Sequence, residues 1–219
     1  MPEFESTPIR VDIVSDVVCP WCVIGYHQLA KAARDTGLQI EVHWHPFELN
    51  PQMAAEGENL RAHLAEKYGT TLEGSIKARA RLTEMGSALG FEFNYADDMR
   101  MVNTFLAHQL IDWTEDQGRG HDMKIALFGA FFTRREDLND INVLVAVAES
   151  LALDGQAARA MLESQSRAET VCQKEQFWTS RGVTDVPAMI FARQHLVTGA
   201  QGEANYADIL RQLAADPVA

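Results

Sequence analysis

Apolar and polar positions change their spacing several times along the chain, and each change marks a predicted element. The first part of residues 11–26 is short and rich in Val and Ile, which predicts a strand. Beyond it, apolar residues recur at helical spacing as far as Gly37, a residue type that commonly ends helices. Residues 38–44 then alternate between apolar and polar, the pattern of a half-buried strand that His45-Pro46 ends. The chain therefore begins with a strand, a helix and a second strand.

The middle of the chain carries helical patterns punctuated by glycines. Asp140 and Asp154 precede two of these patterns and are candidate helix caps, because their side-chain oxygens can accept bonds from free backbone N–H groups. The predicted helices cover residues 59–68, 72–89, 103–116, 121–134, 141–150 and 154–163. This region is therefore expected to be all-helical and to separate two parts that contain strands.

Strand patterns return near the C-terminus. The predicted elements are a helix, a Val-Pro turn, two strands and a final helix, at residues 167–180, 186–187, 188–192, 196–199 and 206–215. The two strands are expected to form a hairpin, because Gln194-His195 separates them by a tight turn. Together the patterns predict an α/β protein whose strands come from both ends of the sequence.

Composition limits the classes of function. The chain has 219 residues and 47% apolar content, enough for one domain with an insertion and a sizeable core. Its formal net charge of −12 argues against nucleic acid or an anionic membrane surface as a partner. No apolar run approaches the roughly 18 residues of a membrane span, and residues 1–6 are acidic, without the apolar core of an export signal. We therefore expect a cytoplasmic protein.

Cys19-Pro20-Trp21-Cys22 lies where the first predicted strand passes into the first helix. Positions three apart share a helix face, so the two sulfurs can approach bonding distance. The helix start favours a thiolate on Cys19, and Pro20 suits the first helical position because its missing N–H needs no partner there. Cys22 lies one turn further in, where burial is expected to keep its thiol protonated. The expected chemistry is attack on a disulfide by Cys19 and resolution of the mixed disulfide by Cys22.

A zinc site is the alternative for such a pair, because Cys-Pro-x-Cys also begins many zinc-binding segments. A structural zinc needs a second Cys or His pair at short spacing. The third cysteine, Cys172, is far along the chain, and His43 and His45 have the spacing of a strand. In a reducing cytoplasm, a cysteine pair is more often catalytic than a structural cross-link. The pattern therefore favours dithiol chemistry and predicts no metal site.

Two motifs at opposite ends of the chain carry a resemblance to a known family. The first is Ser-Asp-Val-Val-Cys-Pro-Trp-Cys at residues 15–22. The second is Gly-Val-Thr-Asp-Val-Pro-Ala-Met-Ile-Phe at residues 182–191, with Phe-Trp before it and Gly-Ala-Gln after it. With the order of elements, they resemble a thioredoxin fold carrying the helical insertion of the DsbA family, and specifically its cytoplasmic FrnE-like branch. The resemblance implies an N-terminal thioredoxin part, a helical insertion and a C-terminal thioredoxin part, at residues 1–58, 59–163 and 164–219.

The resemblance also implies a function. It implies a dithiol–disulfide oxidoreductase, acting as oxidase, reductase or isomerase, in which Cys19 attacks and Cys22 resolves. It further implies a cis peptide bond between Val186 and Pro187 beside the cysteines, since cis costs an X-Pro bond only about 0.5–1 kcal/mol. The backbone of Val186 would then pair with an extended substrate by strand addition. The partners implied are proteins or small molecules that contain thiols or disulfides.

Two other classes are alternatives. Kappa-class glutathione transferases and 2-hydroxychromene-2-carboxylate isomerases are similar in fold, but they bind glutathione and generally have a serine at the start of the active helix. The two cysteines favour redox exchange, whereas residues 103–108 resemble a stretch of those enzymes and leave glutathione open as a co-substrate. No other cofactor is implied. A non-enzymatic holdase chaperone, using apolar surface around the thiols, is the third class.

Four further residues carry expectations of their own. Trp21, between the cysteines, is expected to be exposed and either to contact substrate or to cover the first helical turn. Asp16 is a candidate cap of the thiol helix, although its charge would oppose a nearby thiolate. Asp12, on the strand before the thiols, is a candidate proton relay to Cys22. Cys172 is expected to be a small buried apolar residue, as free cysteines usually are.

Overall fold

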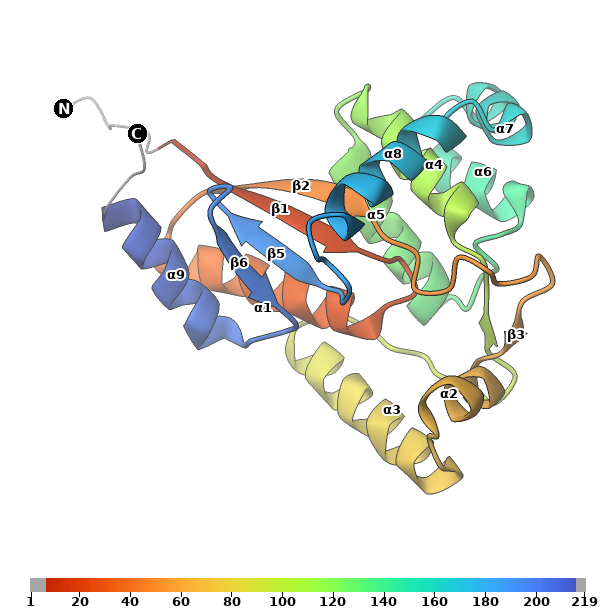
Figure 1. The fold of residues 1–219 in the computed structure, drawn as a ribbon, viewed down its shortest axis with the longest axis horizontal. Coiled ribbons are helices and arrows are strands. Elements are labelled where there is room, and N and C mark those ends of the chain that lie inside the picture. Colours follow the sequence, from red (N-terminus) through yellow and green to blue (C-terminus); the bar gives the residue numbers. More distant parts are fainter. Residues whose placement is uncertain (1–6, 216–219) are drawn as a thin grey trace.

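The computed structural model describes residues 7–215, so the expectation for residues 1–6 lies outside it. Its central sheet has the order β2-β1-β5-β6. β2 is parallel to β1, β5 is antiparallel to β1, and β6 is antiparallel to β5 (Figure 1). The strands are β1 Ile9–Ser15, β2 Ile40–Pro46, β5 Ala188–Phe191 and β6 His195–Thr198. The expected pairing of strands from both ends of the chain is therefore confirmed.

Strand β1 is buried on both faces, which explains its nearly continuous apolar run. Val11 and Ile13 point into the main core, where α1 (Pro20–Thr36) and α9 (Glu203–Ala215) run side by side. Val14 points the opposite way, into a smaller cluster that includes Trp178 of α8 (Ala168–Thr179). Alternation along the strand thus separates the α1 side of the sheet from the α8 side.

Helix α1 begins and ends as its sequence predicts. Cys19 is the N-cap residue and Pro20 follows at the first helical position. At the other end, Gly37 has a φ of 69°, and its N–H donates to the carbonyls of Ala33 and Arg34. Inside the helix, Gly25 permits a close approach: a Cβ there would lie 3.2 Å from Cγ of Pro187. The absence of this side chain brings the turn before β5 against the thiol helix.

The region between β2 and α8 is helical, as expected. Its helices are α2 Leu60–Tyr68, α3 Leu72–Ala88, α4 Phe105–Glu115, α5 Gly120–Phe128, α6 Ile141–Ser150 and α7 Gly155–Ser164. Both predicted aspartate caps are confirmed: Asp140 accepts from the N–H of Asn142, and Asp154 accepts from the N–H of Gln156. In Figure 1, α2 and α3 lie together on one side of this region and α4 to α7 on the other.

Three local features differ from the prediction. The segment predicted as one helix over residues 121–134 ends in a π-helical turn, η1 Gly129–Thr133. A two-residue ladder joins β3 Glu58–Asn59 to β4 Arg100–Met101, and strands this short leave no periodic signal. Strand β2 continues through Pro46, which pairs with Ser15 at the end of the ladder, where a proline is tolerated.

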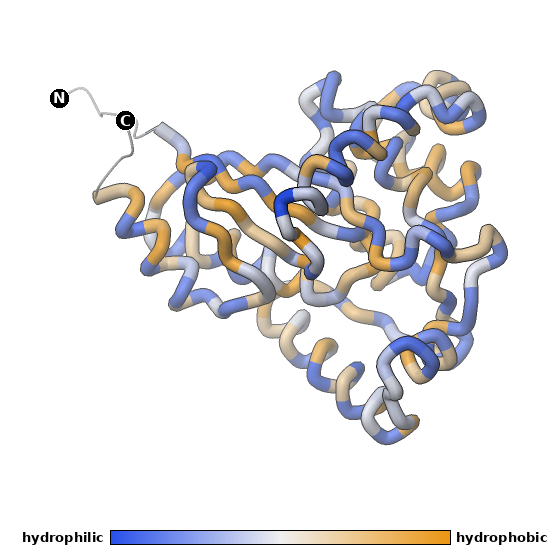
Figure 2. The backbone as a smooth tube through the Cα atoms, viewed as in Figure 1, coloured by the Kyte–Doolittle hydropathy of each residue, from blue (hydrophilic) through white to orange (hydrophobic). Residues whose placement is uncertain are grey.

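The hydrophobic interior follows the strands and the helices that cover them. Figure 2 shows apolar residues concentrated along the central strands, with polar residues on the outer turns of the helices. A single large apolar cluster joins the sheet, α1 and α9 to the helical region. Among residues 7–215, no helix has the length and apolar character needed to cross a membrane.

Candidate active site

The two cysteines lie at the junction of β1 and α1, and they differ in access to solvent. Cys19 is 4% exposed and Cys22 is fully buried, and both are free thiols. The two thiols are close enough to influence each other's pKa. Cys19 borders an open pocket, whereas Cys22 faces the interior beneath it.

The Val186-Pro187 turn lies against the thiol pair. The peptide bond between these two residues is cis, as the family resemblance implies. The thiol of Cys19 donates a hydrogen bond to the carbonyl oxygen of Val186 across 3.7 Å. The N–H of Gly199 in turn donates to the carbonyl oxygen of Pro187 at 2.8 Å, which fixes the turn to the hairpin. The structure therefore brings the two sequence motifs together into one site.

A buried acid lies just before the cysteines. Asp16 has no solvent exposure, and its carboxylate accepts a hydrogen bond of 2.7 Å from the N–H of Leu49. Nε2 of His108, on α4, lies 3.3 Å from this carboxylate and 3.2 Å from the carbonyl oxygen of Phe47. Both neighbours are acceptors, so Nε2 carries a proton. Burial alone would raise the pKa of Asp16, but His108 and the Leu49 N–H outweigh it and lower that pKa.

The expectation that Asp16 caps the thiol helix is wrong. No side chain makes a capping bond to the start of α1. The carboxylate is instead engaged by the N–H of Leu49 and by His108. A cap would have required the side chain to reach back to the N–H groups of the first turn, and long-range partners compete successfully for it.

A buried cation completes this inner cluster. Lys124 of α5 is 1% exposed, and its Nζ donates to the carbonyl oxygen of Ser15 at 3.1 Å. The ammonium also lies 5.3 Å from the ring centre of Trp44 and 5.2 Å from that of Phe128. Burial lowers the pKa of Lys124 to about 8, although nearby Cys22 and Asp16 oppose this shift. Neither His108 nor Lys124 was identified from the sequence; a charged residue within an otherwise apolar helical pattern was the available signal.

The inner cluster changes the expected distribution of charge between the sulfurs. The neighbouring Cys22 and burial raise the pKa of Cys19. Burial also opposes a charge on Cys22, but the nearby Cys19 and Ser15 side chains and the charge of Lys124 lower the pKa of Cys22. These shifts favour a thiolate on Cys22, whereas the helix start alone favours one on Cys19. The two sulfurs titrate as one coupled unit.

Asp12 serves a structural ion pair and not the thiols. Its carboxylate is held by Nε and Nη2 of Arg10, at 2.9 and 2.6 Å, and lies 2.8 Å from Nε2 of His45. Burial would raise the pKa of Asp12, but His45 and Arg10 outweigh it and lower that pKa. The proton-relay interpretation of Asp12 is therefore not supported, and Asp16 is the carboxylate that lies near the cysteines.

Cys172 is exposed, so the expectation of a buried apolar residue is wrong. It lies on α8 one position after the buried Val171. The expectation rested on the general tendency of free cysteines to be buried, which this position does not follow. Burial and the acidic neighbours Glu175 and Glu48 raise the pKa of the Cys172 thiol.

An apolar pocket of about 360 Å³ opens beside Cys19. Its walls come from the thiol turn, the Val186 turn, α2, α3 and η1, and include Leu49, Leu64, Leu82, Tyr95, Phe131 and Phe132. Trp21 is 38% exposed at the rim, as predicted, with the guanidinium of Arg81 5.8 Å from its ring centre. A cavity of this size and character is typical of a ligand site.

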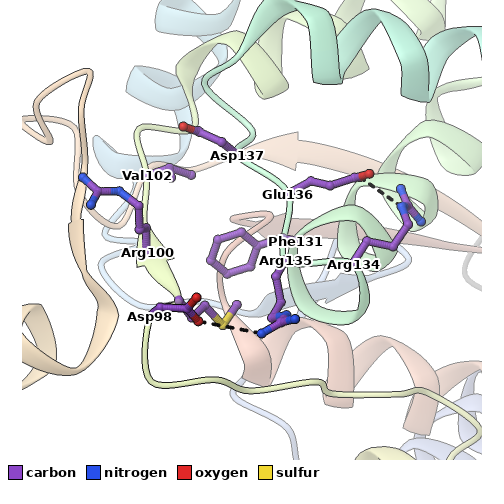
Figure 3. A pocket seen from close by; sticks show the side chains of 9 residues that line it. Asp98, Arg100, Val102, Phe131, Arg134, Arg135, Glu136 and Asp137 are labelled. Carbon is purple, nitrogen blue, oxygen red and sulfur yellow. Dashed lines mark hydrogen bonds and ion pairs between the residues drawn. The ribbon is translucent and has the colours of Figure 1, made fainter.

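A second pocket, of about 270 Å³, lies on the other side of Phe131 and has a different character. Figure 3 shows Arg134 paired with Glu136 and Arg135 paired with Asp98 around it. Its charged groups largely satisfy one another, and it contains no residue of the thiol motif. Among residues 7–215, no group of three or more His, Cys, Asp or Glu side chains is arranged to hold a metal ion.

Comparison with known proteins matches residues 10–211 to the model of the DSBA-like thioredoxin domain. One relative is the uncharacterized protein YwbO of Bacillus subtilis, which is 26% identical over 196 residues, or 89% of this chain and 92% of YwbO. A similar solved structure is that of the probable DsbA oxidoreductase SCO1869 from Streptomyces coelicolor, at 28% identity and a TM-score of 0.86. That match covers 96% of this chain and 92% of SCO1869.

Two more distant structures share the fold. A 2-hydroxychromene-2-carboxylate isomerase is 16% identical with a TM-score of 0.69, covering 94% of this chain and 98% of the isomerase. The cytosolic disulfide reductase DsbM from Pseudomonas aeruginosa, in a structure with GSH, is 14% identical with a TM-score of 0.62. That match covers 94% of this chain and 99% of DsbM.

Proposed function

Because the chain belongs to the DSBA-like thioredoxin domain family, a family of thiol–disulfide oxidoreductases, we propose that Cys19 and Cys22 are its redox-active pair. The observation that carries this proposal is the difference in access between the two sulfurs. Cys19 borders an open pocket next to the Val186 turn, whereas Cys22 is buried on the side of Lys124. A substrate can therefore reach Cys19, and Cys22 acts within the protein.

The charge distribution assigns complementary roles to the sulfurs. When the reduced pair attacks a disulfide, Cys19 forms the new S–S bond and its proton passes to the Cys22 thiolate. The substrate sulfur that leaves departs as a thiolate and takes up a proton. Cys22, deprotonated again, then attacks Cys19 and releases the second substrate sulfur, which leaves a Cys19–Cys22 disulfide. The substrate gains two electrons and the cysteine pair loses them; oxidation of a dithiol follows the same steps in reverse.

The inner cluster supports the step in which Cys22 carries charge. In both directions Cys22 is at some point a thiolate, as attacking or leaving group. Ser15 and Lys124 stabilise this thiolate, and the buried ammonium is effective because little solvent screens it. His108 and the N–H of Leu49 hold the Asp16 carboxylate in its place near the thiols.

The Val186-Pro187 turn and Trp21 form the proposed substrate contacts. The carbonyl oxygen of Val186 accepts a hydrogen bond from the thiol of Cys19 in the free protein. A substrate N–H would take this acceptor when Cys19 forms a mixed disulfide, which is the backbone pairing implied by the resemblance. Trp21, exposed at the rim, would pack against the substrate on the other side.

The proposed partners are thiol- or disulfide-containing proteins or small molecules in the cytoplasm, with glutathione as a co-substrate. The cytosolic DsbM structure with GSH supports this setting by analogy of fold. The sulfurs themselves carry the two electrons, so the proposed reaction needs no metal or organic cofactor.

Reduction of insulin in the presence of dithiothreitol tests the proposal. We expect Cys19→Ser to reduce the catalysed rate to the uncatalysed background, because no other thiol borders the pocket. Cys172→Ser is the matched control and should retain full activity, since Cys172 lies on the exposed face of α8. Full activity in Cys19→Ser would exclude the redox assignment. Glutathione-dependent turnover that survives in that variant would instead favour the isomerase class.

A further inference from the structure

Arg79 of α3 lies in the wall of the apolar pocket beside Cys19, and two of its three guanidinium nitrogens have no hydrogen-bond partner in the described part of the chain. Its Nη1 donates to the carbonyl oxygen of Ala96 at 3.2 Å and lies 3.9 Å from the Asp97 carboxylate. Nε and Nη2 are buried and have no hydrogen-bond partner among residues 7–215. The side chain is only 11% exposed. A buried cation with unsatisfied donors costs free energy, and a ligand anion that reaches it would offset this cost.

Arg10 shows what the same two nitrogens do when a carboxylate is present. Its Nε and Nη2 donate side by side to the two carboxylate oxygens of Asp12, at 2.9 and 2.6 Å. This two-bond fork is a strong and geometrically specific way to bind a carboxylate. Arg79 keeps the equivalent edge of its guanidinium free.

Ser75 provides a second, independent observation at the same site. Its residue is 2% exposed, and its hydroxyl is buried without a partner while lining the same pocket. Ser75 lies four positions before Arg79 in α3, so both side chains are on one helix face. Ser75 and Arg79 therefore both line this pocket, whose other walls are mainly apolar, and each has a buried polar group without a hydrogen-bond partner among the described residues.

The polar wall and the reactive sulfur belong to one cavity. Tyr95 lines the pocket and lies within electrostatic range of both Arg79 and Cys19. The volume of about 360 Å³ suits a small molecule. The pocket in Figure 3 offers a contrast, because the guanidinium groups of Arg134 and Arg135 there already have carboxylate partners.

We propose that the pocket binds a small dithiol or disulfide that carries a carboxylate on an apolar chain, with the carboxylate on Nε and Nη2 of Arg79. This assignment of a substrate class rests on the proposed function. In the oxidising direction, one thiolate of the bound dithiol attacks Cys19 and breaks the Cys19–Cys22 bond, and Cys22 leaves as a thiolate. The second thiol of the ligand then attacks its own disulfide-bound sulfur, releases Cys19 and closes the ligand disulfide. Two electrons pass from ligand to protein, and the two ligand protons go to the thiols or to water.

Lipoate and lipoamide form a matched pair of probes. Both carry a dithiolane on an apolar chain, which ends in a carboxylate in lipoate and in a neutral amide in lipoamide. Calorimetric titration of the redox-inactive Cys19→Ser variant measures binding without turnover. We expect lipoate to bind at least about tenfold more tightly than lipoamide, a ratio worth about 1.4 kcal/mol. Combining Arg79→Gln with Cys19→Ser should abolish the preference for lipoate over lipoamide, and combining Arg79→Lys with Cys19→Ser should retain part of it. Lys77→Gln removes the same charge from an exposed position of α3 and should leave the preference unchanged.

Turnover provides the second readout. In single-turnover reactions of the oxidised wild-type protein, the second-order rate constant for dihydrolipoate should exceed that for dihydrolipoamide by a similar ratio, and Arg79→Gln should equalise the two. Equal binding of acid and amide, or a preference that survives in Arg79→Gln, would overturn the proposed substrate class. Such a result with insulin reduction intact would leave the redox function in place. A carboxylate preference in binding, without any disulfide exchange, would retain the ligand site and reject the redox function.

Discussion

The two sides of the cysteine pair have opposite characters. On the inner side, Asp16, His108 and Lys124 are buried charged or polar groups that engage one another or the backbone around Cys22. On the outer side, Cys19 borders an apolar pocket whose buried Arg79 keeps two donors free. The inner side can stabilise a thiolate but admits no substrate, whereas the outer side admits a substrate. Reactivity and selectivity are thus determined by different residues.

Both sides depend on the helical region between β2 and α8. His108 and Lys124 come from α4 and α5, while Arg79 comes from α3. The turn η1 adds aromatic rings to the outer pocket. A π-helical turn changes the direction in which successive side chains point, and such turns occur frequently at functional sites. The thioredoxin part supplies the two sulfurs and the Val186 turn, and the helical region surrounds them.

The largest effect is expected when each of the two cysteines is replaced separately. Cys22→Ser should accumulate mixed disulfides with substrate proteins, because the intramolecular competitor that releases them is lost. Cys19→Ser should accumulate none, since Cys22 is inaccessible. Thiol-sensitive bands on non-reducing gels measure this difference, which should approach all or none.

Exposed Cys172 requires a control in that experiment. The trapping variants are therefore compared in a Cys172→Ser background, which removes the thiol on the surface of α8. Equal trapping by the two variants in this background would show that both sulfurs are accessible and would contradict the inner and outer assignment.

The inner side is tested by changing its charges in opposite directions. Lys124→Met removes the cation that favours the Cys22 thiolate and should raise the apparent pKa of the thiol pair by about one unit. The reduced form then loses about 1.4 kcal/mol, so the reduction potential should fall by roughly 30 mV. Asp16→Asn removes a nearby negative charge and should shift both quantities the other way. Thiolate absorbance against pH and equilibration with glutathione buffers measure them.

If the reduction potential shifts in opposite directions in Lys124→Met and Asp16→Asn, the shifts are electrostatic and do not arise from damage to the fold. Both substitutions disturb buried groups, so both are expected to lower stability. If the reduction potential changes in the same direction in the two variants, the shifts arise from altered structure, and the assigned role of the inner cluster is wrong. Lys31→Met, on the exposed part of α1, is the matched charge control and should leave the potential unchanged.

Local patterns in the sequence were sufficient for the thioredoxin part of the site. The apolar run before Cys19, Pro20 at the helix start and Gly37 at its end each act through a few neighbouring residues, so the strand and helix were predictable. The place of the Val186-Pro187 turn followed from the family resemblance, because its contact with Cys19 joins residues far apart in the sequence.

The inner cluster was not predictable in the same way. Lys124 reaches Ser15 across 109 positions, and the apolar residues beside it in α5 do not indicate which partner it has. The charge on the thiol pair was assigned to Cys19 because the helix start is a local feature, whereas Lys124 and Ser15 act on Cys22 only in the folded chain. The expectation for Cys172 fails because it used the average burial of free cysteines, whereas the exposure of this residue depends on how α8 packs.

The smallest predicted effect concerns two partly buried carboxylates near Asp16, those of Glu48 and Glu175. Burial raises the pKa of Glu48 to about 7, and raises that of Glu175 to about 8 with a further contribution from the Glu48 charge. An oxygen of each carboxylate is buried without a hydrogen-bond partner among residues 7–215. Between about pH 4.5 and pH 8, the folded protein therefore binds more protons at these sites than the unfolded chain does. Titration of these two carboxylates should therefore lower stability as pH rises through this window.

Urea denaturation of the oxidised protein at pH 5 and at pH 8 measures this effect without titration of Cys19 and Cys22. From pH 5 to pH 8, ionisation of Glu48 and Glu175 should lower the unfolding midpoint of the wild type, and Glu175→Gln should remove at least half of this contribution, because the amide stays neutral at both pH values. Burial lowers the pKa values of His27, His108 and His121, and their titration shifts the midpoint the opposite way by the same amount in both proteins. Partial exposure of Glu175 to solvent keeps the effect modest. Glu169→Gln, on an exposed position of the same helix, should leave the wild-type difference unchanged.

Below pH 8 Lys124 is protonated in both folded and unfolded chains, so it contributes little to the slope, whereas above pH 8 it should make stability rise again. A midpoint in Glu175→Gln that still falls by the full wild-type amount would show that this carboxylate is already ionised at neutral pH and that the inner side holds no uncompensated acid there.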